Sequence, residues 1–137
     1  MKPAQRGQAL LETAIVLPLM LALMLGFLAV LVRIEAQVEL DTATGLAAAA
    51  AASAPPGDFS RSSSYAHDTW QGTLRFYGYL RPGPLSGCAG YSRAGDEVRC
   101  TGTATLRYSD TAMGLVVPFD LELSAQATAR SSEFRSR

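Results

Sequence analysis

An uncharged apolar run dominates the N-terminal part of the chain. No Asp, Glu, Lys or Arg occurs from Thr13 to Val32, a stretch of twenty residues. A helix of that length measures roughly 30 Å, which is the thickness of the hydrocarbon core of a bilayer. Pro18 and Gly26 interrupt the run, and membrane helices tolerate both residue types. The run therefore predicts one membrane-spanning helix.

The same helix is expected to continue beyond the membrane. The residues that follow, as far as Ala54, include no proline and are mostly strong helix formers. Pro55-Pro56-Gly57 should end the helix, because proline breaks the hydrogen-bond ladder and disfavours helical geometry in the residue before it. One face repeats at helical spacing and should need a cover. It comprises Ala36, Leu40, Ala43 and Ala47, and we expect Ile34 and Val38 to widen it.

The apolar pattern changes to a period of two in the C-terminal half. Residues 57–69 are rich in Ser, Gly, Asp and Arg and are expected to form a loop. Apolar and polar residues then alternate over 70–81, 97–108 and 115–128. Such alternation predicts three antiparallel strands with one buried and one solvated face, and Pro118 indicates an edge position. Three strands alone make a marginal core, so the sheet should pack on the helix.

The expected fold class is therefore α+β, with a long helical spine followed by a small antiparallel sheet. The segments are a leader at 1–7, a transmembrane and extended helix at 8–54, a β-rich head at 55–129, and a polar tail at 130–137 that we expect to be disordered.

The flanking charges predict the topology. Lys2 and Arg6 precede the apolar run without an acidic neighbour, so the N-terminus should be cytoplasmic and the head exported. The competing interpretation is a secretory signal peptide that is removed. Its apolar core normally has only about 7–15 residues, and a small-residue cleavage site follows closely. Here the small residues around Ala52-Ser53-Ala54 come well after the run, which favours a retained anchor.

Cys88 and Cys100 both belong to the head. In an oxidising compartment the two residues can form a disulfide, which by the loop-entropy relation stabilises a small domain by about 3 kcal/mol. Free thiols or metal ligands are the alternatives. The eleven residues between the cysteines match no common metal-site spacing, and His67 is the one histidine of the chain.

Composition argues against several classes of function. Twelve basic residues balance twelve acidic ones, so no basic footprint for nucleic acid stands out. Ser64, His67 and Asp68 share one polar stretch, without a nucleophile turn or a glycine-rich oxyanion segment. The acidic pairs Glu35/Glu39 and Asp120/Glu122 are most simply solvated. The aromatic residues Phe76, Tyr77, Tyr79 and Tyr91 are expected to pack in the core and the sheet, and an adhesive surface is the alternative. We expect no enzymatic activity and no cofactor.

Glu12 stands at the start of the apolar run, five residues after Gly7. A carboxylate at the mouth of a membrane helix is costly and usually has a partner or a task. The segment Arg6-Gly7-Gln8-Ala9-Leu10-Leu11-Glu12-Thr13-Ala14-Ile15-Val16-Leu17-Pro18 resembles the N-terminus of the TadE-like pseudopilins of tight-adherence (Tad) pilus systems, a branch of the type IV pilin superfamily.

The resemblance implies a processing step and a role in assembly. A membrane prepilin peptidase would cut after Gly7, leaving Gln8 as the new N-terminus and Glu12 as the fifth mature residue. Glu12 of one subunit would then neutralise the new amine of a neighbour, and such a pair in a low dielectric sets subunit register. The simpler alternative places Glu12 in the headgroup layer, favoured by the dipole of the helix N-terminus.

Two departures from the family pattern, together with the added soluble head, imply a minor subunit and not the main filament protein. Gln8 replaces the Phe or Met common at this position, and Thr13 replaces the tyrosine of the short Flp major pilins. The implied partners are the peptidase, sibling pilin subunits, the assembly platform of the bacterial inner membrane, and lipid. The implied function is the assembly, priming or tip of an adhesive pilus. The alternative is a membrane-anchored binding module that never polymerises.

Overall fold

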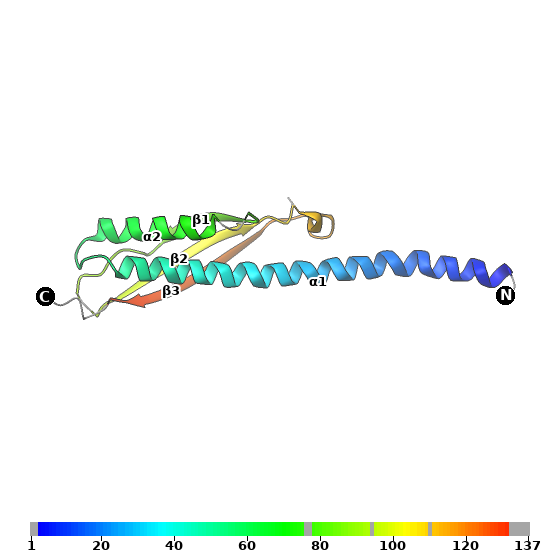
Figure 1. Cartoon of the computed structure of the whole chain (residues 1–137), viewed down its shortest axis with the longest axis horizontal. Helices are drawn as coiled ribbons and strands as arrows, with labels where there is room; N and C mark the ends of the chain where they lie inside the picture. Colours follow the sequence, from blue (N-terminus) through cyan, green and yellow to red (C-terminus); the bar gives the residue numbers. More distant parts are fainter. Residues whose placement is uncertain (1–2, 76–77, 94, 110, 132–137) are drawn as a thin grey trace.

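The computed structural model of the protein describes residues 3–75, 78–93, 95–109 and 111–131, with side chains from residue 12 onward apart from that of Ala112. Figure 1 shows one long helix, α1, with the other described elements gathered beside its C-terminal half. The element order is α1, α2, β1, β2, a 3-10 turn and β3. The expected combination of a long apolar helix and a small three-stranded antiparallel sheet is confirmed.

Helix α1 spans Pro3–Ala52, fifty residues or roughly 75 Å. It begins five residues before the expected start, and proline suits this first position because it lacks the N–H that a first turn leaves unpaired. It ends two residues before Ala54, where Ser53 and Ala54 form a turn. Pro18 lies inside α1 without ending it.

The buried face of α1 is partly as expected. Ala36, Leu40, Ala43 and Ala47 have no exposed surface, which confirms the predicted stripe. The expectation that Ile34 and Val38 widen this stripe is wrong, because both are more than half exposed. Each lies two residues from Ala36 and therefore about 200° around the helix from it, on the opposite side.

Helix α2 spans Phe59–Leu74 where the sequence suggested a loop followed by a strand, so both of those expectations are wrong. The Asp58 side chain caps the helix by accepting a hydrogen bond from the Arg61 N–H at 3.0 Å. Every fourth residue from Ser62 is buried, namely Ser62, Ala66, Trp70 and Leu74. The helix was not predicted for two reasons. Ser62 and Ala66 are small and give little apolar signal in a serine-rich sequence, and the four-residue spacing of Trp70 and Leu74 also fits the period of two of a strand.

The sheet contains β1 (Leu80–Ser86), β2 (Glu97–Leu106) and β3 (Leu121–Arg130) in the order β1-β2-β3, with both pairings antiparallel. The second strand lies within its predicted range, with Val98, Cys100, Ala104 and Leu106 buried. The third begins at Leu121 and not at Leu115, because Ala112–Leu115 forms a 3-10 turn. Pro118 consequently lies before the strand and not in it.

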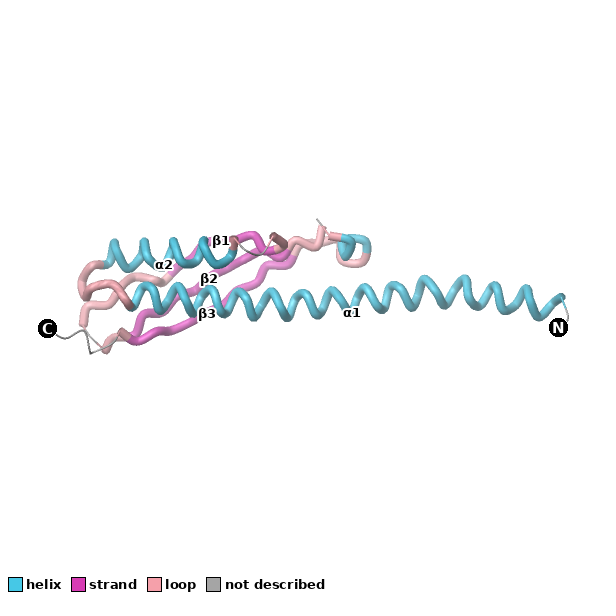
Figure 2. The backbone as a smooth tube through the Cα atoms, in the orientation of Figure 1, coloured by secondary structure: helices cyan, strands magenta, loops and turns pink. Residues whose placement is uncertain are grey.

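One face of the sheet packs on the helices, and the head has two layers (Figure 2). Helices α1 and α2 run antiparallel beside each other, and the sheet crosses behind them. Trp70 of α2 is 1% exposed and lies against Gly102 of β2, where an added Cβ would come within 2.2 Å of the indole ring. Glycine at position 102 therefore lets the largest side chain of the core sit directly on the strand.

The end of the last strand reaches the first residue of the expected tail. Arg130 closes β3, and Ser131 is buried, with its backbone N–H donating to the Asp96 carbonyl oxygen at 3.1 Å. The remainder of the expected tail, residues 132–137, lies outside the described residues.

Candidate membrane and assembly surfaces

The N-terminal part of α1 has the properties of a membrane-spanning helix. From Glu12 to Ala52 the helix is long and apolar enough to cross a bilayer, and its most apolar window of 18 residues has a mean hydropathy of 2.9. Only 6% of that window is buried against the rest of the chain. The apolar side chains therefore do not belong to the head's own core, as they would in the central helix of a soluble domain.

Glu12 lies on the exposed surface of α1, at the N-terminal edge of the apolar segment. It borders a shallow hollow on the helix formed with Thr13, Val16, Leu17 and Met20. The predicted processing residues Gly7 and Gln8 lie within α1, in the part of the helix where only the backbone is described. Glu12 is therefore presented outward, where another chain or a lipid headgroup can reach it.

A second exposed apolar feature lies on the half of α1 that carries the head. Val30, Ile34, Val38 and Leu46, which we call the outer ridge, are between 48% and 58% exposed. Thr42 fills the remaining position of this four-residue repeat, and its hydroxyl donates to the Val38 carbonyl oxygen at 2.8 Å. The ridge is thus a slanted row of side chains in which the hydroxyl of Thr42 is already hydrogen-bonded. The row turns by about 40° around α1 at each step, and its middle residues Ile34 and Val38 lie opposite the buried Ala36.

The sequence suggested that Glu39 is a solvated acid, but in the structure its side chain has a partner in the head. It is half-buried, and the Tyr79 hydroxyl donates to its Oε2 at 2.7 Å, which fixes the start of β1 to α1. Burial raises the pKa of the Glu39 carboxyl; the hydrogen bond from Tyr79 opposes the rise and the negative charge of Glu35 adds to it. Its role is to join head and helix.

The connection between β2 and β3, residues 107–120, reaches along α1 towards the apolar segment (Figure 1). We call it the β2–β3 loop. Near its start, the Tyr108 hydroxyl donates to the Ala29 carbonyl oxygen at 2.6 Å, and both residues are buried. Farther along, Leu115 and Phe119 are 89% and 60% exposed. An apolar loop therefore lies against α1 beside residues of the uncharged run.

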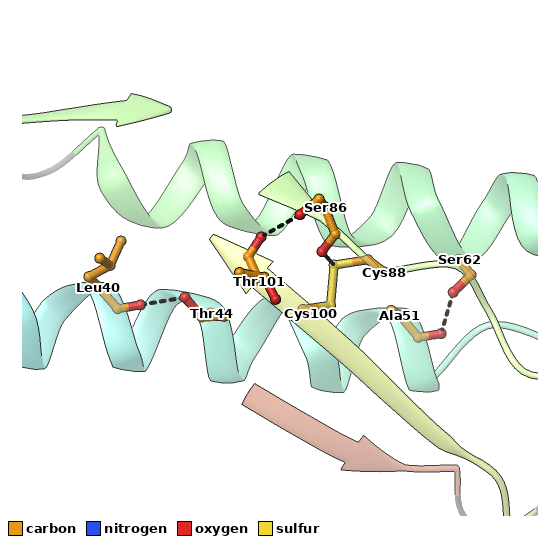
Figure 3. Close-up of a disulfide and its surroundings, with 8 residues drawn as sticks. All are labelled: Leu40, Thr44, Ala51, Ser62, Ser86, Cys88, Cys100 and Thr101. Atoms are coloured by element: carbon orange, nitrogen blue, oxygen red, sulfur yellow. Dashed lines mark hydrogen bonds between the residues drawn. A yellow bond between two sulfur atoms is a disulfide. The ribbon is translucent and has the colours of Figure 1, made fainter. Parts of the chain in front are cut away.

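The predicted disulfide is present. Cys88, just after β1, is bonded to Cys100 in β2, as Figure 3 shows. Both cysteines are buried in the head beside the C-terminal half of α1, where the Ser62 hydroxyl of α2 donates to the Ala51 carbonyl oxygen at 2.9 Å. The bond joins the edge strand to the central strand and closes the hairpin between them.

The candidate catalytic residue His67 lies in a different element from the one expected. His67 lies on the exposed side of α2 and not in a loop, at the edge of two shallow grooves between α2 and β1. Within the described ranges, no three His, Cys, Asp or Glu side chains gather as metal ligands would. Of the aromatic residues, Tyr79 and Tyr91 pack in the head, as expected, whereas Phe76 and Tyr77 lie outside the described residues.

Two features of the surface escaped sequence reasoning. Two residues of the outer ridge, Ile34 and Val38, were predicted on the buried face, although Val30, Ile34 and Val38 recur every four residues in the sequence. Residues 115–120 of the β2–β3 loop were predicted as the start of the third strand, although Pro118 lies within that range. Comparison with family models, with curated proteins and with solved structures finds no match to this chain.

Proposed function

We propose that this chain is a minor pilin, or pseudopilin, of a Tad-type pilus, processed by a prepilin peptidase and assembled through α1. The observation that carries the proposal is the outer ridge. It continues the exposed apolar surface of α1 beyond the membrane segment, and its middle residues Ile34 and Val38 lie on the side of the helix opposite the buried Ala36.

The ridge has the geometry of a helix-packing surface. Its members recur every four residues, and rows of this spacing pack into the grooves of a neighbouring helix. From Val30 to Leu46 the row is roughly 24 Å long. A membrane-anchored module that stays monomeric gains nothing from such a row in water, whereas a subunit whose helix packs among sibling helices buries it.

Glu12 and the leader supply the second line of support. The Gly7–Glu12 spacing resembles that of TadE-like pseudopilins, and cleavage after Gly7 would leave an α-amine at Gln8. A neighbour's Glu12 would pair with that amine. In a low dielectric the attraction between the amine and the carboxylate is strong, and a charge left without its partner is costly. The pair therefore favours the one register between subunits in which both charges meet.

The topology follows from the same residues. Lys2 and Arg6 keep the N-terminus in the cytoplasm, α1 crosses the inner membrane, and the head lies in the periplasm or outside the cell. The disulfide of the head suits an oxidising compartment. The partners are the prepilin peptidase, sibling pilin subunits, the inner-membrane assembly platform and, before assembly, lipid.

A charge placed on the ridge tests the proposal. Val38→Asp should leave the chain in the membrane at its normal level but prevent piliation, because an aspartate cannot be buried between helices without a partner. Pili are counted by electron microscopy of the native host, and the chain is measured by immunoblot of membranes. Ser60→Asp is the matched control, because it adds the same charge at an exposed position in the first turn of α2 and should leave piliation intact.

Normal piliation with Val38→Asp would refute assembly through the ridge and favour the anchored binding module. Glu12→Ala provides an independent test of register. That variant should still be cleaved but should not support pilus formation, and normal piliation would remove the assembly role of Glu12.

A further inference from the structure

The β2–β3 loop is hydrogen-bonded to α1 at a position inside the uncharged run and not beyond its end. The Tyr108 hydroxyl donates to the Ala29 carbonyl oxygen at 2.6 Å, and Ala29 belongs to the uncharged run that predicts the membrane span. Burial raises the pKa of the Tyr108 hydroxyl, and the positive charge of Arg33, the first charged residue of α1 after that run, opposes the rise. The contact between the head and α1 therefore extends into the last turn of the uncharged run.

The loop presents apolar side chains where it approaches this segment. Leu115 and Phe119 are the most exposed large apolar residues of the described part of the head, and Val116 between them is also exposed. In water these side chains would have no favourable contact. A soluble domain rarely places three of them together on one loop without a partner.

Several backbone N–H groups of the loop donate to carbonyl oxygens within the loop. The Gly114 N–H donates to the Thr111 carbonyl oxygen at 3.0 Å, and the N–H groups of Val116 and Val117 donate to the Met113 carbonyl oxygen at 2.9 and 2.8 Å. The Ser109 hydroxyl donates to Asp120 Oδ1 at 2.9 Å and closes the base of the loop. A segment that satisfies its own amides can enter the boundary between headgroups and acyl chains at low cost.

The apolar surface of the loop is continuous with that of the membrane helix. Val117, Phe119 and Leu121 line one side of a shallow hollow of about 250 Å³, and α1 lines the other side. The residues contributed by α1 are Gly26, Ala29, Val30 and Arg33. Whatever covers the helix here also covers the loop.

We propose that the tip of the β2–β3 loop inserts into the outer lipid–water interface beside α1 and sets the depth of the helix in the bilayer. Lipid is the occupant because the loop continues the surface that spans the membrane, and because Arg33 lies beside the hollow at the height of the phosphates. This inference rests on the part of the proposed function in which α1 crosses a bilayer with the head outside.

The depth has a consequence for Glu12. A hydrocarbon layer of roughly 30 Å corresponds to about twenty helical residues. If its outer boundary lies at Ala29, its inner boundary lies near Leu10, and Glu12 is drawn inside the layer instead of lying at its edge. The loop thereby raises the cost of an unpaired Glu12 before assembly.

Spin labels on the full chain in vesicles of phosphatidylethanolamine and phosphatidylglycerol test the proposal. Leu115→Cys carries the label of interest, Leu21→Cys reports on the span, and Gln126→Cys on the exposed face of β3 is the control in water. Collision rates with molecular oxygen and with a soluble nickel chelate are measured by power saturation. We expect the Leu115 label to collide several-fold more with oxygen and several-fold less with nickel than the Gln126 label does.

Each of the other outcomes contradicts either the insertion of the loop, the membrane span of α1 or the assignment of lipid as the occupant. A Leu115 label as accessible to nickel as the Gln126 label, with the Leu21 label in lipid, refutes insertion of the loop and leaves the membrane span intact. A Leu21 label in water refutes the span and the inference together. A Leu115 label shielded from both reagents, with broadening that depends on protein-to-lipid ratio, shows that a second copy covers the loop and overturns the assignment to lipid.

Discussion

Replacing Gly102 with alanine should destabilise the head, because Trp70 occupies the space that a side chain would need. An added Cβ would meet indole carbons at 2.2, 2.6 and 2.9 Å, well inside van der Waals contact. Trp70 is 1% exposed and packed between helix and sheet, so it cannot move aside freely. Overpacking of this kind costs up to about 3 kcal/mol, while alanine in a strand recovers about 1 kcal/mol relative to glycine. We expect a net loss of about 2 kcal/mol, or roughly thirty-fold in the folding equilibrium.

The loss can be measured on the full chain in a non-ionic detergent by guanidinium unfolding. Trp70 is the one tryptophan in the sequence, so its emission reports on the head. Gly72→Ala is the matched control, since an added Cβ at this position of α2 meets nothing within 4 Å and alanine favours helix. That control should be stabilised by about 0.5–1 kcal/mol. If Gly102→Ala is as stable as Gly72→Ala, the packing of Trp70 on β2 is refuted.

The remaining predictions concern the disulfide, the Glu39 carboxyl and the alanine face of α1. Replacing Cys88 and Cys100 together with alanine should lower the free energy of unfolding by about 3 kcal/mol, and an unchanged unfolding midpoint would contradict the loop-entropy argument. Burial raises the pKa of the Glu39 carboxyl in the folded state above its ordinary 4.5, so the unmodified protein should lose stability as the pH rises above 4.5. The variant Glu39→Gln keeps an acceptor for the Tyr79 hydroxyl and should not show this loss. Parallel pH profiles of the unfolding midpoint for the two proteins would show that ionisation of the carboxyl does not affect stability. Ala47→Leu should cost about 1–3 kcal/mol because Ala47 has no exposed surface, and a neutral result in the same unfolding assay would mean that this face of α1 is not closely packed.

The sequence was informative where one period prevailed over a long stretch. The uncharged run and the alanine stripe predicted α1 and its buried face. Strand β2 was predicted because Val98, Cys100, Ala104 and Leu106 alternate with polar residues, with Gly102 at the remaining inward position. Helix α2 was missed because half of its buried stripe is Ser62 and Ala66, which carry little apolar signal. Their burial depends on the closeness of α1, and a local pattern does not contain that information.

The surfaces were harder to predict than the core. Glu12 and the leader stood out because a charge beside an apolar run is conspicuous in any sequence. The outer ridge was not recognised, because apolar residues on a helix look alike until the head shows which side it covers. The β2–β3 loop was misread for a similar reason, since Leu115, Val117 and Phe119 alternate as strand residues do, although Ala112–Leu115 forms a 3-10 turn.

Processing and assembly as a pseudopilin can be tested by the intact mass of the protein extracted from the membranes of its native host. We predict the mass of a chain that has lost residues 1–7 and begins at Gln8. Loss of thirty or more residues would indicate a secreted domain instead. A full-length product would contradict the account, because Gly7 would then be uncut and Glu12 would have no new amine to meet.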